Sequence, residues 1–336
     1  MNVSRAVRRT LIVLLCVVLI IALWGVGQKF LVEPGVQPSR PPEATSEAVL
    51  EVVDRTTLSV PETLRMEGRS FEADVEETYL LQFEATTTKP TNSAGDAMYF
   101  GASLACGGPN GGTLRSVGGT QNVRSSEQVT ISNQFLLRIE ESGSHTCRLS
   151  LNSPNEDAVA AGTEAVVDTR WTATRVEGFA VEASADEQLP RAIDPGEKAT
   201  AFSVSVDVED FPKREIDVLG TLHVTTCTGT NGSREDGRTW CEEEGVDLDG
   251  SGVEVTYHTD VLDASGEVCA SAVGSRTRAR IVRFTHHRML HVAQPFREPL
   301  STCGSSARVV VTVQNAGPAP VVVHRSTSTL VVLPNA

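Results

Sequence analysis

Hydrophobic and polar side chains alternate in short segments along most of this chain. From residue 78 onward these segments are rich in Val, Thr, Ser and Leu, and clusters of Gly, Pro and Asn separate them. A period of two with turn residues between the segments predicts the strands of antiparallel sheets. No long helical periodicity accompanies them, so we predict an all-β fold. The predicted strands are 78–88, 98–105, 129–139, 166–176, 201–208, 253–257, 281–292, 308–313 and 321–332.

One segment breaks this pattern, because residues 11–26 form an unbroken apolar run, LIVLLCVVLIIALWGV. With its two flanking residues the run would form a helix of about 24–27 Å, which is just long enough to cross the core of a bilayer. Three arginines and no acidic residue precede it, which predicts a cytoplasmic amino terminus. We therefore expect a cytoplasmic segment 1–10 and a transmembrane signal anchor 11–27. The protein would be a single-pass protein of the cell membrane with extracytoplasmic carboxy-terminal domains.

A cleaved secretory signal peptide is the alternative for this segment. It has a basic start and an apolar centre, although Gly25-Val26-Gly27 is a poor cleavage site. The chain beyond is extracytoplasmic in either case. Residues 28–46 contain four prolines and predict an extended Pro-rich stalk.

The charge balance narrows the range of partners. Lys and Arg number 29 against 43 Asp and Glu, which gives a net charge of −14. The first 29 residues hold four basic residues and no acidic one, so the external part carries −18. A surface this acidic repels nucleic acid and anionic lipid headgroups, and we expect no nucleic-acid partner. Aromatic residues make up only 5% of the chain, which disfavours a sugar-binding surface of stacked rings.

Segments of the external part resemble one another in a fixed order, which predicts an internal duplication. We expect two tandem β-sandwich domains: repeat 1 at 47–178, and repeat 2 at 179–336 with an insertion at 228–270. Few residues are identical, so two unrelated β segments of similar composition are the alternative. The matched segments are 77–106 with 197–227, 129–139 with 282–292, and 166–176 with 322–332.

Six cysteines follow the apolar run, and an oxidising exterior favours their pairing. Repeat 1 holds only two of them. Their counterparts in the alignment define a second pair, which leaves the last two for the insertion. The disulfides predicted in this way are Cys106–Cys147, Cys227–Cys303 and Cys241–Cys269. Pairing of neighbours in repeat 2 is the alternative, with Cys227–Cys241 and Cys269–Cys303.

The run before the second of these cysteines, ESGSHTC at residues 141–147, resembles the D-S-G-x-Y-x-C run of immunoglobulin-like domains, with His145 in place of the tyrosine. The resemblance implies an Ig-like sandwich of two antiparallel sheets joined by one disulfide. It covers seven residues only, and the chain has no tryptophan between Cys106 and Cys147.

Two patterns offer metal ligands. Asp247, Asp249 and Ser251 stand at alternate positions in DLDGSGVE, which resembles a calcium loop, although a polar hairpin turn explains the same residues. In FTHHRMLHV, His287 and His291 share one face of a predicted strand and could bind copper or zinc. A solvated sheet face is the alternative there. Calcium is the one cofactor that these patterns suggest, and we otherwise expect none.

Motifs of hydrolases, metalloproteases and nucleotide-binding sites are absent from the sequence, so we expect a non-catalytic protein. The preferred function is a protein-interaction or accessory module of the cell envelope, with another envelope or membrane protein as its partner. The insertion offers Trp240 and the acidic Glu242, Glu243 and Glu244 for such contact, although Trp240 could instead pack over a disulfide. A metal- or ligand-binding surface domain and a secreted hydrolase without a recognisable motif are the alternatives.

Overall fold

The computed structural model confirms the all-β prediction, because the described residues form four antiparallel sheets. Pro41–Ala336 form one compact unit. Within the described residues, no helix has the length and apolar character needed to cross a membrane. The predicted anchor 11–27 and stalk 28–46 lie outside those residues. The structure describes residues 48–90, 97–124, 126–154, 163–185, 189, 192–211, 215–226, 250–282, 287–296 and 303–334.

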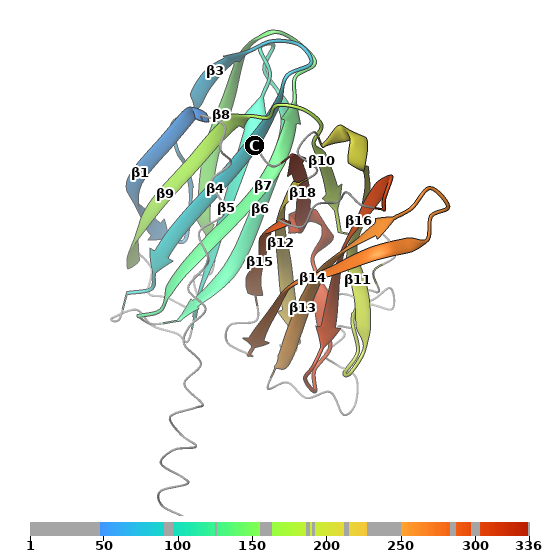
Figure 1. The fold of residues 1–336 in the computed structure, drawn as a ribbon. Helices are drawn as coiled ribbons and strands as arrows, with labels where there is room; N and C mark the ends of the chain where they lie inside the picture. The colour runs from blue at the N-terminus through green and yellow to red at the C-terminus, as the bar shows by residue number, and fades with distance from the viewer. Residues whose placement is uncertain are drawn as a thin grey trace, which may run out of the picture. The chain divides into compact units, whose positions relative to one another are not determined.

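The first sandwich consists of two sheets whose inner faces share one buried cluster. One sheet has the order β1-β9-β4-β7, and the other has the order β2-β8-β5-β6, with β3 also paired to β8 (Figure 1). Alternate apolar residues such as Leu81, Phe83 and Ala85 of β4 point into this cluster. The strands are β1 (Ala48–Val60), β2 (Glu62–Arg65), β3 (Arg69–Ala73), β4 (Thr78–Thr88), β5 (Ala97–Gly107), β6 (Thr113–Arg124), β7 (Gln128–Arg138), β8 (Gly143–Ser153) and β9 (Thr163–Arg175).

The second sandwich encloses a separate buried cluster. Its sheets have the orders β10-β18-β12-β15, with β17 also paired to β12, and β11-β16-β13-β14. Two short 3-10 helices, η1 (Val208–Asp210) and η3 (Arg325–Thr327), lie between strands along the chain. The strands are β10 (Val181–Ser184), β11 (Lys198–Asp207), β12 (Ile216–Thr226), β13 (Ser251–Leu262), β14 (Val268–Ile281), β15 (His287–Phe296), β16 (Ser306–Asn315), β17 (Val321–Val323) and β18 (Thr329–Pro334).

The strand order of both sandwiches is that of a jelly roll. When β2 is counted with β3, and β17 with β18, each sandwich has eight strands. Numbered 1 to 8 along the chain within each sandwich, these strands form two sheets with the orders 1-8-3-6 and 2-7-4-5. An immunoglobulin domain instead places strands A, B, E and D opposite C, F and G. The predicted sandwich is therefore confirmed, but the Ig-like topology is wrong.

The seven-residue motif that suggested the immunoglobulin resemblance has a local structural role. His145 is fully buried, and its Nε2 donates a hydrogen bond to the carbonyl oxygen of Glu141 over 3.0 Å. Its ring stacks on Phe71 with the ring centroids 6.1 Å apart. A tyrosine at this place in immunoglobulin domains makes a similar bond to the upstream backbone. The bond thus occurs at a corner between strands in this topology as well, so the motif does not identify the fold.

The two sandwiches share a strand order, but the sequence alignment of the repeats is wrong in its first block. Residues 77–106 cover β4 and most of β5, whereas residues 197–227 cover β11 and β12. By sheet position β4 corresponds to β12 and β5 to β13, so this block is displaced by one strand. The block that matches β7 with β15 joins equivalent positions. Origin by duplication stays a prediction.

The predicted insertion 228–270 is also corrected. Its residues 251–262 form β13, an interior strand between β16 and β14, and its residues 268–270 begin β14. Val253, Val255 and Tyr257 of this strand are buried in the second core. Residues 228–249 of the predicted insertion lie outside the described residues.

The structure contains two disulfides among its described cysteines, and one of them overturns the predicted pairing. Cys106–Cys147 forms as predicted, but it joins the neighbouring strands β5 and β8 of one sheet and does not link two sheets. Cys303 pairs with Cys269, as the neighbour alternative had it. The prediction failed because the displaced alignment matched β5, which carries Cys106, with β12 and the residue after it, whereas β5 corresponds to β13 by sheet position. Cys227 and Cys241 lie outside the described residues.

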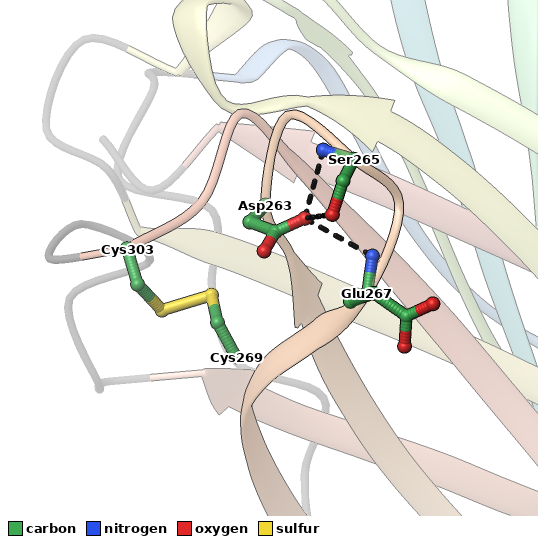
Figure 2. The surroundings of a disulfide bond; sticks show 5 residues. All are labelled: Asp263, Ser265, Glu267, Cys269 and Cys303. Carbon is green, nitrogen blue, oxygen red and sulfur yellow. Dashed lines mark hydrogen bonds between the residues drawn. A yellow bond between two sulfur atoms is a disulfide. The ribbon is translucent and has the colours of Figure 1, made fainter.

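Figure 2 shows the Cys269–Cys303 bond beside the turn between β13 and β14. Oδ1 of Asp263 accepts hydrogen bonds from the Ser265 amide, the Ser265 hydroxyl and the Glu267 amide. These hydrogen bonds lower the pKa of Asp263, and the bond from the Ser265 hydroxyl has the largest effect. The turn thus sets the register of β14, which places Cys269 within reach of the chain that enters β16.

Candidate functional site

The two sandwiches meet through the outer faces of β7 and of the β12–β18 pair. The polar side chains of β7 that alternate with its core residues lie on the outer face of the strand and are buried in this contact. The strand is therefore buried on both faces. Met289 of β15 joins the core cluster of the first sandwich. A Cβ atom on Gly119 of β6 would lie 2.7 Å from Met289 Cε and 2.8 Å from Ile131 Cγ2, so any larger residue there would force these side chains to move. The apolar part of the contact consists of Leu80, Leu136, Ala180, Leu219, Val331 and Leu333.

Two amide side chains of β7 connect the sandwiches. Asn133 Nδ2 donates to the carbonyl oxygens of Gly118 (2.8 Å) and Thr327 (2.9 Å), and its Oδ1 accepts from Thr329 Oγ1 (2.6 Å). Gln134 Oε1 accepts from Thr221 Oγ1 over 3.1 Å. Because buried amides are costly unless they are paired, these contacts favour one relative position of the two sheets.

Three histidines of the second sandwich converge beside this contact. His223 lies on β12, His287 begins β15, and His324 directly follows β17. The pairing of β12 with both other strands brings the three residues together, since Thr225 is opposite His287 and Val224 is opposite Val323. One ring nitrogen from each histidine lies within 4.8 Å of the other two. We call these residues the histidine cluster.

Hydrogen bonds and ring contacts hold the histidine cluster in place. His223 Nε2 is 2.9 Å from His287 Nδ1, and the rings of His223 and His324 stack with their centroids 4.3 Å apart. The Oγ1 atom of Thr327 is 2.7 Å from His223 Nδ1, and that of Thr225 is 2.9 Å from His324 Nε2. Each threonine therefore fixes the orientation of one imidazole ring.

The first sandwich contributes to the surroundings of the cluster. The Tyr99 ring meets the His287 ring edge to face at a centroid distance of 5.5 Å. The backbone amide of His287 donates to Asn122 Oδ1 over 2.8 Å. His223 is only 4% exposed, whereas His287 and His324 are half-buried. The cluster is thus sheltered, with one histidine buried and two half-buried.

The predicted pair His287 and His291 does not form one site. The side chain of His291 points to β7, where its Nδ1 is 3.3 Å from Ser132 Oγ. Burial lowers the pKa of His291 to about 4. The residues that converge with His287 are instead His223 and His324, which sequence reasoning missed. Neither has another histidine nearby in the sequence, since His223 stands alone in β12 and His324 alone after β17, so no local spacing marks them.

The predicted calcium site is described only at Ser251. Its hydroxyl donates to Asn315 Oδ1, and the residue is buried at the first position of β13. Asp247 and Asp249 lie outside the described residues, as do Trp240 and the predicted partner-binding residues Glu242, Glu243 and Glu244.

Comparison with known proteins identifies no family. No family model matches the chain, and no curated protein sequence matches it. Among solved structures, the N-terminal CBM22-1-CBM22-2 tandem domain from Paenibacillus barcinonensis Xyn10C is 10% identical, with a TM-score of 0.25 over 88% of this chain and 100% of that one. PNGase F is 11% identical, with a TM-score of 0.34 over 85% and 96%. Infectious bursal disease virus Gx strain is 11% identical, with a TM-score of 0.30 over 90% and 76%. At these TM-scores the likenesses carry no conclusion about function.

Proposed function

We propose that this chain is a non-catalytic, membrane-anchored extracytoplasmic module that binds another protein of the cell envelope. The observation that supports the proposal best is the long connection between Thr226 of β12 and Ser251 of β13. Connections in compact domains are mostly 2–6 residues, and those longer than about 12–15 residues without secondary structure of their own are usually either functional or linker segments. This one comprises residues 227–250, and it carries Trp240 and the run of three glutamates that follows Cys241.

The strand pairing shows where this connection leaves the second sandwich. Thr226 pairs with Val321 at the start of β17, and Ser251 pairs with Ile281 at the end of β14. Thr226 Oγ1 also donates to the carbonyl oxygen of Pro320, which precedes β17. Both ends of the connection therefore belong to the end of the sandwich where the histidine cluster lies. A loop carried on a rigid sheet is a usual place for binding specificity.

A buried serine–histidine pair bears on the hydrolase alternative. Ser132 and His291 are within hydrogen-bond distance, but Ser132 is only 8% exposed and lies between the two sandwiches. A substrate could not reach its hydroxyl. A histidine with a pKa of about 4 is also a weak general base near neutral pH. This pair therefore gives no support to a hydrolase.

Crosslinking in the native membrane, followed by mass spectrometry, tests the proposed partner. The test variant is Trp240→Ala combined with Glu242→Gln, Glu243→Gln and Glu244→Gln. We avoid deletion of 241–269, because it would remove β13 and Cys269. The matched control replaces three exposed glutamates of the first sandwich: Glu72→Gln, Glu140→Gln and Glu164→Gln.

The proposal expects one stoichiometric partner that the wild type and the control capture and the test variant loses. Capture of the same partner by the test variant would place the contact elsewhere. Absence of any stoichiometric partner would contradict the proposal.

The membrane anchor is tested separately by extraction of the protein from membranes. We expect full-length protein with a carboxy-terminal tag to resist high salt and to dissolve in detergent. A soluble secreted form that begins near Gln28 would show that residues 11–27 are a cleaved signal peptide.

A further inference from the structure

We infer that His223, His287 and His324 bind one divalent transition-metal ion of the class that favours imidazole, Zn²⁺ or Cu²⁺. This inference stands independently of the proposed protein partner. Three imidazoles form a known protein ligand set for zinc, and imidazole nitrogen also suits copper. Calcium and magnesium prefer oxygen ligands and are not expected here.

The spacing of the three rings is close to what a metal ion requires. At a Zn–N distance of 2.0–2.1 Å, neighbouring nitrogens of a tetrahedral site lie about 3.4 Å apart. His223 Nε2 and His287 Nδ1 are 2.9 Å apart, and the three candidate nitrogens all lie within 4.8 Å of one another. Small movements of the rings would bring the nitrogens to metal distance. A metal ion would take the place of the proton that His223 and His287 now share in their hydrogen bond.

The contacts behind the rings are those of a metal site. Ligating histidines usually bond their second nitrogen to a nearby oxygen, which fixes the ring and the tautomer. Thr327 Oγ1 does this for Nδ1 of His223, which leaves Nε2 as the nitrogen that faces His287. Thr225 Oγ1 does the same for Nε2 of His324.

The alternative is a purely structural cluster in which hydrogen bonds and stacking hold β12, β15 and the chain after β17 together. A metal site would bind one metal ion per chain, and its affinity would depend on the threonines that orient the rings. A structural cluster would bind no more metal than other surface histidines do.

Isothermal titration calorimetry on full-length protein in detergent micelles, freed of metal by a chelator, separates them. Zn²⁺ and Cu²⁺ are titrated, with Ca²⁺ as the hard-cation control. We expect one equivalent of Zn²⁺ or Cu²⁺ per chain. His324→Gln and the triple variant at all three histidines should weaken binding at least about 100-fold, and Thr327→Val about 10–100-fold. His258→Gln, at a half-buried histidine that lies 3.8 Å from Asp260 on β13, should leave binding unchanged.

Cobalt gives a second measurement that does not depend on activity. Co²⁺ bound by three imidazoles in a tetrahedral site shows intense visible absorption, and we expect this spectrum in the wild type but not in His324→Gln. Because His324 is half-buried, its variant should fold even if a change at the buried His223 does not. Unchanged melting with the chelator present confirms folding. The inference is overturned if the triple variant binds Zn²⁺ and Cu²⁺ as tightly as the wild type, or if the wild type binds neither stoichiometrically.

Discussion

The change Asn133→Ala tests whether buried amide bonds fix the contact between the two sandwiches. Asn133 is 1% exposed and belongs to the first sandwich, yet it donates to the carbonyl oxygen of Thr327 and accepts from Thr329, both in the second. Truncation to alanine removes these bonds and the bond to Gly118 without adding a new partner.

The expected loss of stability follows from the groups that the change leaves behind. A buried polar group that loses its partner costs about 1–3 kcal/mol. The carbonyl oxygens of Gly118 and Thr327 lose their shared donor, and the Thr329 hydroxyl and the Gln134 backbone amide lose their shared acceptor. A water molecule in the vacated space would recover part of the loss. We therefore expect Asn133→Ala to lower the free energy of unfolding by about 3 kcal/mol.

Urea denaturation of the compact unit Pro41–Ala336, followed by circular dichroism and by the fluorescence of the buried Trp171, measures this loss. Asn110→Ala is the control, because Asn110 is exposed and bonds only to Glu141 of its own sandwich. Its cost should stay below about 0.5–1 kcal/mol.

A double-mutant cycle with Thr329→Val examines the coupling across the contact. We expect Asn133→Ala and Thr329→Val to be non-additive by at least about 0.5 kcal/mol, because their side chains share a 2.6 Å hydrogen bond. Additive effects, or a loss below about 0.5 kcal/mol for Asn133→Ala alone, would refute the reasoning that this bond forms across the two sandwiches.

Two further predictions concern the reduction of the disulfides and the stability of the protein at acidic pH. The exposed Cys269–Cys303 bond should open in mild reductant before the buried Cys106–Cys147 bond, so alkylation and peptide mapping should label Cys269 and Cys303 first. Opening of Cys106–Cys147, which spans 41 residues, should cost about 4 kcal/mol, and equal labelling of all four cysteines would contradict this order. The pKa of His291 is lowered to about 4, so only unfolded protein binds its proton between about pH 6.5 and 4. The contribution of His291 is therefore complete above pH 6.5 and is lost as the pH falls. Urea denaturation at pH 7.5 and at pH 5 measures the free energy of unfolding at each pH. The stability lost between pH 7.5 and pH 5 should be smaller in His291→Gln than in the wild type, by up to about 2 kcal/mol. Equal losses would show that His291 is not buried.

The strands that sequence reasoning found are those with strong alternation. The prediction 78–88 coincides with β4, and 129–139 differs from β7 by one residue at each end. The same reasoning missed β1 and β6. β1 is an edge strand with largely exposed side chains, and Gly118 and Gly119 interrupt the pattern of β6. Both strands gain stability from neighbours in the sheet and not from a clear apolar face.

The histidine cluster shows why the candidate site was only partly predictable. His287 stood out because it lies in a short run with other histidines, and the shared face with His291 was correctly inferred from the period of a strand. Their common direction did not give them a common site, because one reaches the cluster and the other reaches Ser132. His223 and His324 are separated from His287 by 64 and 37 positions, and only the pairing of strands brings them together.

The sequence by itself determined the local conformation of this protein. The alternation of side chains is a property of neighbouring residues, so it indicates strands without knowledge of their partners. The tertiary structure alone decided strand order, the partner of Cys303 and the meeting of three histidines. These features depend on which distant segments pair, and that choice reflects the packing of whole sheets. A displacement of one strand in the alignment was therefore enough to give the wrong disulfide.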